Sequence, residues 1–164
     1  MNKSMTLDAV DWRILTELQS DGRITNVELA RRVGISPPPC LRRVRALEKA
    51  GVIKGYRTVL DQKQLGFDVT MFAMVGLNSQ AEADLIAFEE RVDALPVVRE
   101  CYMLSGEVDF LLKCVAPDLA TAQDFVINEL TSLPNVDSVK TTLTLRQSKA
   151  EPDIPLSDEV PVEA

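Results

Sequence analysis

Three consecutive prolines, Pro37 to Pro39, constrain the fold of this chain more than any other feature of its sequence. Proline lacks a backbone N–H and clashes with the preceding turn, so such a run is excluded from the interior of a helix or a central strand. The first turn of a helix tolerates it, because the amides there have no partner within the helix. Ser36 is a favoured N-cap residue and Gly51 a favoured helix end. The run therefore predicts a helix from Pro37 to about Ala50.

Two further helices are predicted before the prolines. Apolar residues at helical spacing predict one over residues 8–19. A second begins at the capping-box pattern Thr25-Asn26-Val27-Glu28 and ends before Gly34. In this second helix the small residue Ala30 lies four positions before Gly34, a spacing that lets two helices meet at a tight turn. The pattern predicts a helix-turn-helix.

The helix after the prolines is predicted to have one packing face and one cationic face. At about 100° per residue, Cys40, Val44 and Leu47 cluster on one side. The opposite side holds Arg42, Arg45 and Lys49, with Arg43 on a flank. Most charge runs are solvated faces, but such a face usually mixes signs, and here Glu48 alone offsets the cations.

The charge of the chain is unevenly distributed. A net charge of −7 and an isoelectric point near 4.7 argue, as averages, against a nucleic-acid binder. Residues 1–60, however, carry three Lys and eight Arg against three Asp and three Glu, a net +5, and residues 61–164 carry −12. Such asymmetry indicates that the basic part meets a polyanion.

We predict that this part binds double-stranded DNA, with the third helix entering the major groove N-terminal end first. Side chains near its start would lie nearest the base edges, and the other cations would meet phosphates. The predicted DNA-binding residues are Asn26, Arg32, Ser36, Pro38, Arg42, Arg43, Arg45, Lys49, Lys54 and Arg57. Lys54 and Arg57 lie in an extended segment, residues 52–60, that is either a wing touching phosphate or a plain connecting strand.

The remainder of the chain is predicted to be a βαββαβ ferredoxin-like domain. The pattern places strands at residues 67–77, 97–104, 108–115 and 136–146, and helices at 81–95 and 117–133. A Leu-Pro pair ends each helix before a strand, at Leu95-Pro96 and Leu133-Pro134, which is a weak internal repeat. The fold class is therefore α+β, an N-terminal (winged) helix-turn-helix followed by a C-terminal ferredoxin-like domain.

This organisation predicts four segments. They are the helix-turn-helix (1–54), a connection (55–66), the ferredoxin-like domain (67–147) and an acidic, disordered tail (148–164). The N-terminus has no long apolar run, and the longest apolar stretch, residues 71–77, is too short to span a membrane. We expect a cytoplasmic protein with no membrane partner.

Several chemistries are disfavoured by the composition. Histidine is absent, which excludes a Ser-His-Asp or Cys-His pair and any histidine-containing zinc site. The three cysteines, Cys40, Cys101 and Cys114, are far apart and are expected to be small core residues rather than disulfide or metal ligands. We find no Gly-rich phosphate loop and no catalytic pair of acids, so we expect no enzyme, no cofactor and no metal.

Specific segments resemble one family. They are Leu7-Asp8-x-x-Asp11, Asp21-Gly22-Arg23-Ile24, Val33-Gly34-Ile35-Ser36-Pro37-x-Pro39-Cys40, Ser105-Gly106-Glu107-x-Asp109-Phe110 and Leu133-Pro134-x-Val136. In order and spacing, residues 6 to 147 resemble the Lrp/AsnC family, the leucine-responsive or feast/famine transcriptional regulators. The resemblance implies a regulator that dimerises through the ferredoxin-like domain, assembles further into an octamer, and binds a palindromic promoter site.

The resemblance also implies an amino-acid effector bound between ferredoxin-like domains. The Gly-x-x-Asp loop of the family falls on Gly106 and Asp109, beside Ser105, and Thr142 and Thr144 would line the pocket. Without the resemblance, Asp109 is an ordinary hairpin acid that binds nearby backbone. Val108 and Phe110 stand where the family often has Tyr, which favours an apolar or bulky effector.

A second function class stays open at this point. The chain could be a ferredoxin-like amino-acid-binding or metabolic subunit, with the N-terminal helices as an assembly domain and no role on DNA. Binding to DNA at low salt, or turnover of an amino acid, discriminates the two.

Overall fold

The computed structural model describes residues 6–150 and 154–156. The chain divides into two compact units, which we call the N-terminal unit (residues up to 59, with those from 150 onward) and the C-terminal unit (residues 60–149). Most of the acidic tail that we predict to be disordered, and the first five residues, lie outside the described residues.

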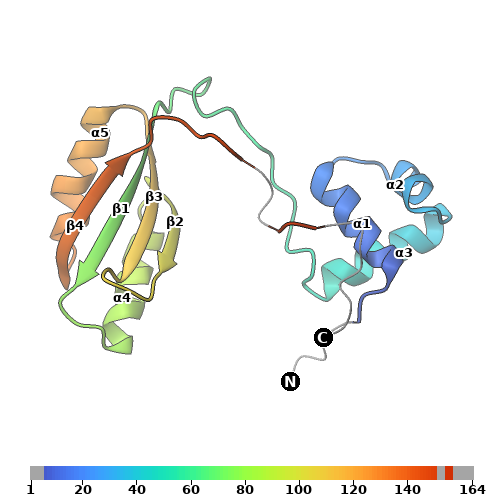
Figure 1. The fold of residues 1–164 in the computed structure, drawn as a ribbon, viewed down its shortest axis with the longest axis horizontal. Helices are drawn as coiled ribbons and strands as arrows, with labels where there is room; N and C mark the ends of the chain where they lie inside the picture. Colours follow the sequence, from blue (N-terminus) through green and yellow to red (C-terminus); the bar gives the residue numbers. More distant parts are fainter. Residues whose placement is uncertain (1–5, 151–153, 157–164) are drawn as a thin grey trace. The chain divides into compact units, whose positions relative to one another are not determined.

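Three helices form the N-terminal unit around a small apolar core (Figure 1). They are α1 (Ala9–Ser20), α2 (Asn26–Val33) and α3 (Pro37–Lys49). The buried residues of the core are Ile14, Leu29, Ala30, Val33, Cys40 and Leu47. The predicted helix-turn-helix is confirmed, and so is the packing face of α3, on which Cys40 and Leu47 are fully buried.

The start of α3 differs from our prediction in one respect. Pro37 to Pro39 fill its first turn as expected, but Ser36, at the N-cap position, makes no capping hydrogen bond with its side chain. A capping hydroxyl accepts from the N–H of the second or third helical residue, and both are prolines here. The first bond of the helix is donated by the N–H of Cys40 to the carbonyl of Ser36, at 3.2 Å.

Only one of the two hydrogen bonds of the predicted capping box of α2 forms. The Glu28 N–H donates to the Thr25 hydroxyl at 3.2 Å, but the Glu28 carboxylate turns towards Arg31 instead of the Thr25 N–H. A complete box, which we did not predict, opens α1. The Asp11 N–H donates to the Asp8 carboxylate at 2.9 Å, and the Asp8 N–H donates to the Asp11 carboxylate at 3.2 Å.

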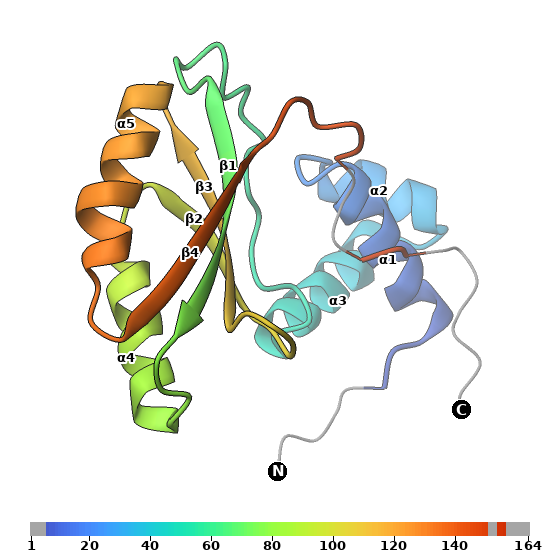
Figure 2. The ribbon, with the colours of Figure 1, turned by 60° about the vertical axis from the view of Figure 1, so that its left-hand side comes forward.

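The C-terminal unit is a four-stranded antiparallel sheet of order β2-β3-β1-β4, with both helices on one side (Figure 2). Its elements are β1 (Val69–Leu77), α4 (Glu82–Asp93), β2 (Val98–Met103), β3 (Phe110–Ala116), α5 (Leu119–Asp124) and β4 (Val136–Leu143). The predicted βαββαβ order is confirmed, although several strands are shorter than predicted because the pairing ends earlier.

The two faces of the sheet differ in what covers them. Residues of β1 alternate between buried and half-buried, and the buried ones face α4 and α5. On this side Phe88 of α4 packs against Phe110 of β3, with ring centroids 4.6 Å apart. No helix among the described residues covers the other side, which we call the open face. It carries Phe72 and Met74 of β1 beside their neighbours on β3 and β4.

The predicted helix over residues 117–133 is not a regular α-helix throughout. After α5 the chain forms a π-helical turn, Phe125–Glu129, and a short 3₁₀ turn, Leu130–Ser132. Phe125 and Leu130 are both buried, five positions apart. In an α-helix that spacing turns one side chain about 140° from the other, whereas a π turn keeps both on one face.

The connection between the units has no β-ladder. Residues 54–60 are irregular and pair with no strand of the described chain, so they carry Lys54 and Arg57 neither in a β-wing nor in a sheet strand. None of the helices in the described residues combines the length and the apolar character that crossing a membrane requires.

The core of the C-terminal unit gives a stability prediction. Phe88→Ala removes a ring that is 1% exposed, so we expect the free energy of unfolding to fall by about 3–5 kcal/mol. Ile86→Ala on the same helix, where the side chain is 48% exposed, should change it by less than about 1.5 kcal/mol. Urea denaturation measures both, and equal effects would contradict the placement of α4.

Candidate nucleic-acid interface and ligand site

The outward side of α3 presents cations that have no partner of their own. The side chains of Arg42, Arg45 and Lys49 are exposed, and they form no hydrogen bond or ion pair with any described residue. The same holds for Lys54 and Arg57 in the connection that follows. Cations on an exposed helix that are not paired with a described carboxylate are available to attract a polyanion.

Two arginines of the predicted set are instead engaged inside the unit. Arg32 lies 2.9 Å from Glu17 and 2.9 Å from Glu28, and Arg43 contacts two aspartates. Arg31 adds to the first cluster at 2.6 Å from Glu28. The cluster links α2 to α1, because Glu17 lies on α1 and the other residues lie on α2. The two glutamates partly neutralise Arg31 and Arg32.

The ion pair of Arg43 joins α3 to the start of α1. Its Nη1 lies 2.8 Å from Asp8 Oδ2 and 2.8 Å from Asp11 Oδ1. The carboxylates raise the pKa of Arg43, Asp11 foremost. The pKa of Asp8 lies below its ordinary value, mainly because the Asp11 N–H and then Arg43 hydrogen-bond to its carboxylate.

The remaining residues of the predicted interface lie at the start of α3. Ser36 and Pro38 are exposed there. Asn26 is half-buried, and its Nδ2 donates to the carbonyl of Pro37 at 2.8 Å. Asn26 therefore connects the first turn of α2 to the first turn of α3.

Asp109 closes one end of the β1–β3 ladder. Its N–H donates to the carbonyl of Val75 at 3.0 Å, and its carboxylate accepts from the Leu77 N–H at 2.7 Å and from Gln80 Nε2 at 2.8 Å. These contacts are those of an ordinary hairpin acid. All of these donors are neutral, however, and no cation of the described residues pairs with the carboxylate, so its negative charge remains available. Ser105 and Gly106 lie exposed in the adjoining turn.

Thr142 and Thr144 lie at the other end of the sheet. Thr142 pairs with Phe72 of β1, and the Thr144 N–H donates to Thr70 at 2.9 Å. Asp109 lies beside the far end of β1, about four residues or ~13 Å further along the strand. It also lies on the β3 side of β1, whereas both threonines are on the β4 side. Within one chain, therefore, the structure does not bring the predicted effector residues together.

Two expectations about neighbouring residues are corrected by burial. Phe110 is fully buried in the core against Phe88. The phenylalanine at this position, where the family often has tyrosine, therefore gives no information about the effector. Cys40 and Cys114 are buried as expected, but Cys101 is exposed on the edge strand β2. No group of three or more Cys, Asp or Glu side chains within the described residues is arranged to hold a metal ion.

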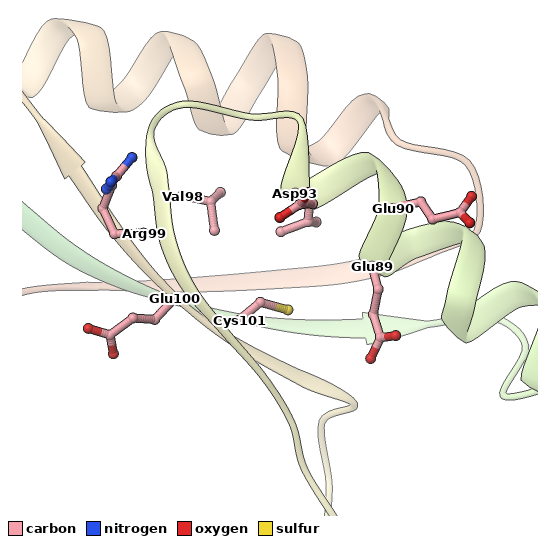
Figure 3. Close-up of a pocket in the computed structure, with 8 residues that line it drawn as sticks. Glu89, Glu90, Asp93, Val98, Arg99, Glu100 and Cys101 are labelled. Atoms are coloured by element: carbon pink, nitrogen blue, oxygen red, sulfur yellow. The ribbon is translucent and has the colours of Figure 1, made fainter. Parts of the chain in front are cut away.

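A hollow of about 450 Å³, which the sequence did not predict, lies between α4 and β2. Figure 3 shows Cys101 projecting towards α4, while the carboxylate of Glu100 leaves the other side of the strand. There Glu100 lies 2.7 Å from Lys113 and accepts from the Tyr102 hydroxyl at 2.7 Å. Lys113, and then Tyr102, lower the pKa of Glu100. Although the residue as a whole is exposed, partial desolvation beside α4, and then the charge of Glu89, raise the pKa of the Cys101 thiol to about 11.

Comparisons with known families match both units. A model of the Lrp/AsnC ligand-binding domain matches residues 70–154, and a model of a winged helix-turn-helix DNA-binding domain matches residues 7–54. Together they cover most of the chain.

Known proteins are similar along nearly their whole length. The leucine-responsive regulatory protein of Rhizobium meliloti is 64% identical over 143 residues, 87% of this chain and 92% of the relative. That of Escherichia coli K12 is 41% identical, over 87% of both chains. The crystal structure of a transcriptional regulator from Neisseria meningitidis, in complex with L-Met, has a TM-score of 0.87 and 36% identity, and the match covers 92% of this chain and 97% of that one.

The Glu28 cluster predicts how acid affects the N-terminal unit. Hydrogen bonds from Arg31, and then from Arg32, lower the pKa of Glu28 from its ordinary 4.5 to about 2. The unfolded chain therefore binds a proton at this group before the folded chain does. The stabilisation is complete above about pH 4.5 and is lost as the pH falls towards about 2. Because the group is exposed, salt screens the effect.

Urea unfolding of the wild type and of Glu28→Gln between pH 7 and pH 3 measures this contribution. We expect the wild type to be the more stable at pH 7, and the gap to narrow steadily below pH 4.5. A gap that is the same at pH 7 and pH 3 would show that the ion pairs contribute nothing.

Proposed function

The chain is a member of the Lrp/AsnC family of transcriptional regulators, and on that premise we propose that it binds specific DNA sites under the control of an amino acid. The observation that carries the proposal is the exposed, unneutralised cationic side of α3 in a helix-turn-helix. Its curated relatives are regulators, and we assign no catalytic activity to it. It would act in the cytoplasm, on double-stranded DNA.

In the proposed complex, α3 lies in the major groove. Arg42 lies in the second turn of α3, nearer its N-terminus, and is a candidate for bidentate pairing with guanine. Arg45 and Lys49, further along, and Lys54 and Arg57, beyond the helix, meet phosphates. A two-fold dimer would present two such helices to successive major grooves ~34 Å apart, and the matching DNA site is a palindrome.

Arg45→Ala tests the phosphate contact. Because each neutralised phosphate contributes about 0.9 to the slope of log K against log salt, we expect the slope to fall by about that amount. Fluorescence anisotropy with a labelled duplex, from 50 to 300 mM salt, measures it. Arg91→Ala, which removes an exposed cation from α4 instead, is the matched control and should leave the slope unchanged. Absence of binding by the wild type at 50 mM salt would favour the alternative without a DNA role.

Self-assembly is proposed to use the open face of the sheet. Leu111 and Val115 of β3 lie on this face with Phe72 and Met74 of β1, and all four are only half-buried in a single chain. Two lysines lie on the same face: Lys113 is already neutralised by Glu100, whereas Lys140 of β4, beside Met74, has no ion-pair partner among the described residues. A second copy packed against β1 and β3 on this face would bury apolar area, and Lys140, on the edge strand β4, could keep its ammonium group in water. Dimers of this kind would assemble further, and we propose an octamer.

The effector site is proposed to combine two copies of the chain. Asp109 supplies a carboxylate for the α-ammonium group, and the turn at Ser105 and Gly106 supplies backbone N–H groups for the α-carboxylate. Since Thr142 and Thr144 lie about 13 Å or more from Asp109 along the same sheet, the threonines that complete the site would come from a neighbouring copy. The L-Met bound to the Neisseria relative supports an amino acid as the effector class.

A thermal-shift screen of the twenty amino acids tests the effector. A ligand at 100 times its Kd stabilises the native state by about 2.7 kcal/mol, so at least one amino acid should raise Tm by several degrees. We expect Asp109→Asn and Thr142→Val each to abolish the shift. The shift, rather than Tm itself, is the criterion, because Asp109 also accepts the Leu77 N–H and its loss lowers the baseline.

Mixing the two variants tests whether the site is shared. If one copy supplies Asp109 and another supplies Thr142, about a quarter of all sites are wild-type in a co-refolded equal mixture of Asp109→Asn and Thr142→Val. A partial return of ligand binding, measured by calorimetry, is expected. No return in the mixture would mean that each site lies within one chain.

A further inference from the structure

We propose that Arg43 is a positioning residue for DNA binding, which orients α3 through Asp8 and Asp11 and does not itself contact DNA. The inference rests on the proposed function and assigns to Arg43 a role different from the base contact that we predicted from its place on the helix.

The first support is the geometry of the ion pair. One nitrogen of Arg43, Nη1, lies 2.8 Å from a carboxylate oxygen of each aspartate. Its side chain is 34% exposed, and that of Asp11 is 5% exposed. The guanidinium of Arg43 therefore points towards α1, whereas Arg42 and Arg45 are exposed and pair with no carboxylate of the described residues.

The second support is the cost of leaving Asp11 alone. Among the described residues, Asp11 is the one polar or charged residue that is buried. A buried carboxylate is strongly unfavourable unless a cation pairs with it. Its Oδ2 accepts the N–H of Asp8, but no cation other than Arg43 among the described residues lies within ion-pair distance. A rotation that turned Arg43 towards DNA would leave this charge buried and uncompensated.

The third support is the weak attachment of the start of α3. Its three prolines lack the amides that a cap would hold, and Ser36 forms no capping bond. The carbonyl of Pro37 is instead held by Asn26 Nδ2 of α2 at 2.8 Å. Arg43 is the second polar anchor, six residues or about 9 Å further along the axis. One anchor from α2 and one from α1 together fix the rotation of α3 about its own axis.

That rotation decides which side chains face outward. On a helix, Arg42 and Arg45 lie about 100° and 200° from Arg43. With Arg43 held against α1, Arg42 lies to one side of α1 and Arg45 on the side opposite to it. If the anchor is lost, α3 can turn within its apolar contacts, and the outward cations no longer meet their targets together, although none of them has been removed.

Salt dependence separates positioning from contact. The probe is a duplex that the wild-type chain selects from a random-sequence pool, and the variants are Asp11→Asn, Arg43→Gln and the double variant. A positioning role predicts that Asp11→Asn loses about tenfold in affinity at fixed salt and that Arg43→Gln, which also breaks the pair with Asp8, loses at least as much. The double variant should lose no more than Arg43→Gln alone, because Asp11→Asn breaks a pair that Arg43→Gln has already removed. Both single variants should keep the wild-type salt slope, since no phosphate contact is lost.

Asp8→Asn is a milder variant that keeps the inference testable if Asp11→Asn or Arg43→Gln fails to fold. Asn is as good an N-cap as Asp, so this change keeps the start of α1 and removes only the exposed half of the ion pair, where Asp8 is 53% exposed. We expect a native circular-dichroism spectrum and a loss of about two- to fivefold in affinity, again with an unchanged slope.

The outcomes separate this inference from the proposed function. A slope lowered by about 0.9 in Arg43→Gln, with wild-type or tighter binding by Asp8→Asn and Asp11→Asn, would show that Arg43 contacts phosphate and would overturn the positioning role alone. Arg45→Ala would still weaken binding in that case. No DNA binding by the wild type would overturn the proposed function and the positioning role with it.

Discussion

The buried carboxylate of Asp11 is the constraint on which the arrangement of the N-terminal unit depends. A charge in that position requires a cation, and the one that reaches it comes from α3, thirty-two residues later in the chain. The start of α3 has no side-chain cap of its own, because its first three residues are prolines. Polar contacts hold α3 from both sides: Asn26 of α2 donates to the carbonyl of Pro37, and Asp8 and Asp11 at the start of α1 pair with Arg43. The orientation of α3 therefore depends on tertiary contacts rather than on its own first turn.

The two units differ in net charge and in the kind of surface they expose. Each difference suits one of two tasks, DNA binding for the N-terminal unit and the proposed association with other copies for the C-terminal unit. The outermost cations of the basic third have no partner among the described residues, while the C-terminal unit is acidic and one side of its sheet is covered by no helix of the described chain. On the open face of the C-terminal unit Lys113 is already paired with Glu100, and Lys140 lies on the edge strand β4. The N-terminal unit thus leaves cations available for a polyanion, whereas the centre of the surface proposed to meet a second copy is apolar and its Lys113 is neutralised.

Much of the fold could be predicted from the sequence, because hydrophobic periodicity and breaker residues act locally. The faces of α3 followed from its helical angles, and the strand order along the chain followed from alternation and turns. The missing cap at Ser36 was readable too, since Pro38 and Pro39 have no N–H to donate. The partners of Arg43, and the separation of Asp109 from Thr142, could not be predicted from the sequence. They depend on how α1 meets α3 and on which strands flank β1, and no local pattern encodes either. The π turn had a faint signal in the five-residue spacing of Phe125 and Leu130.

The distance between Asp109 and Thr142 has a consequence for how such a regulator would measure its effector. A site divided between copies exists only where copies meet, so occupancy and association become one linked equilibrium. The apparent affinity for the amino acid would then rise with the concentration of the protein, and the ligand would in turn favour association. A cell containing more of this regulator would respond at a lower level of the same nutrient, which makes abundance of the chain a second input to the response.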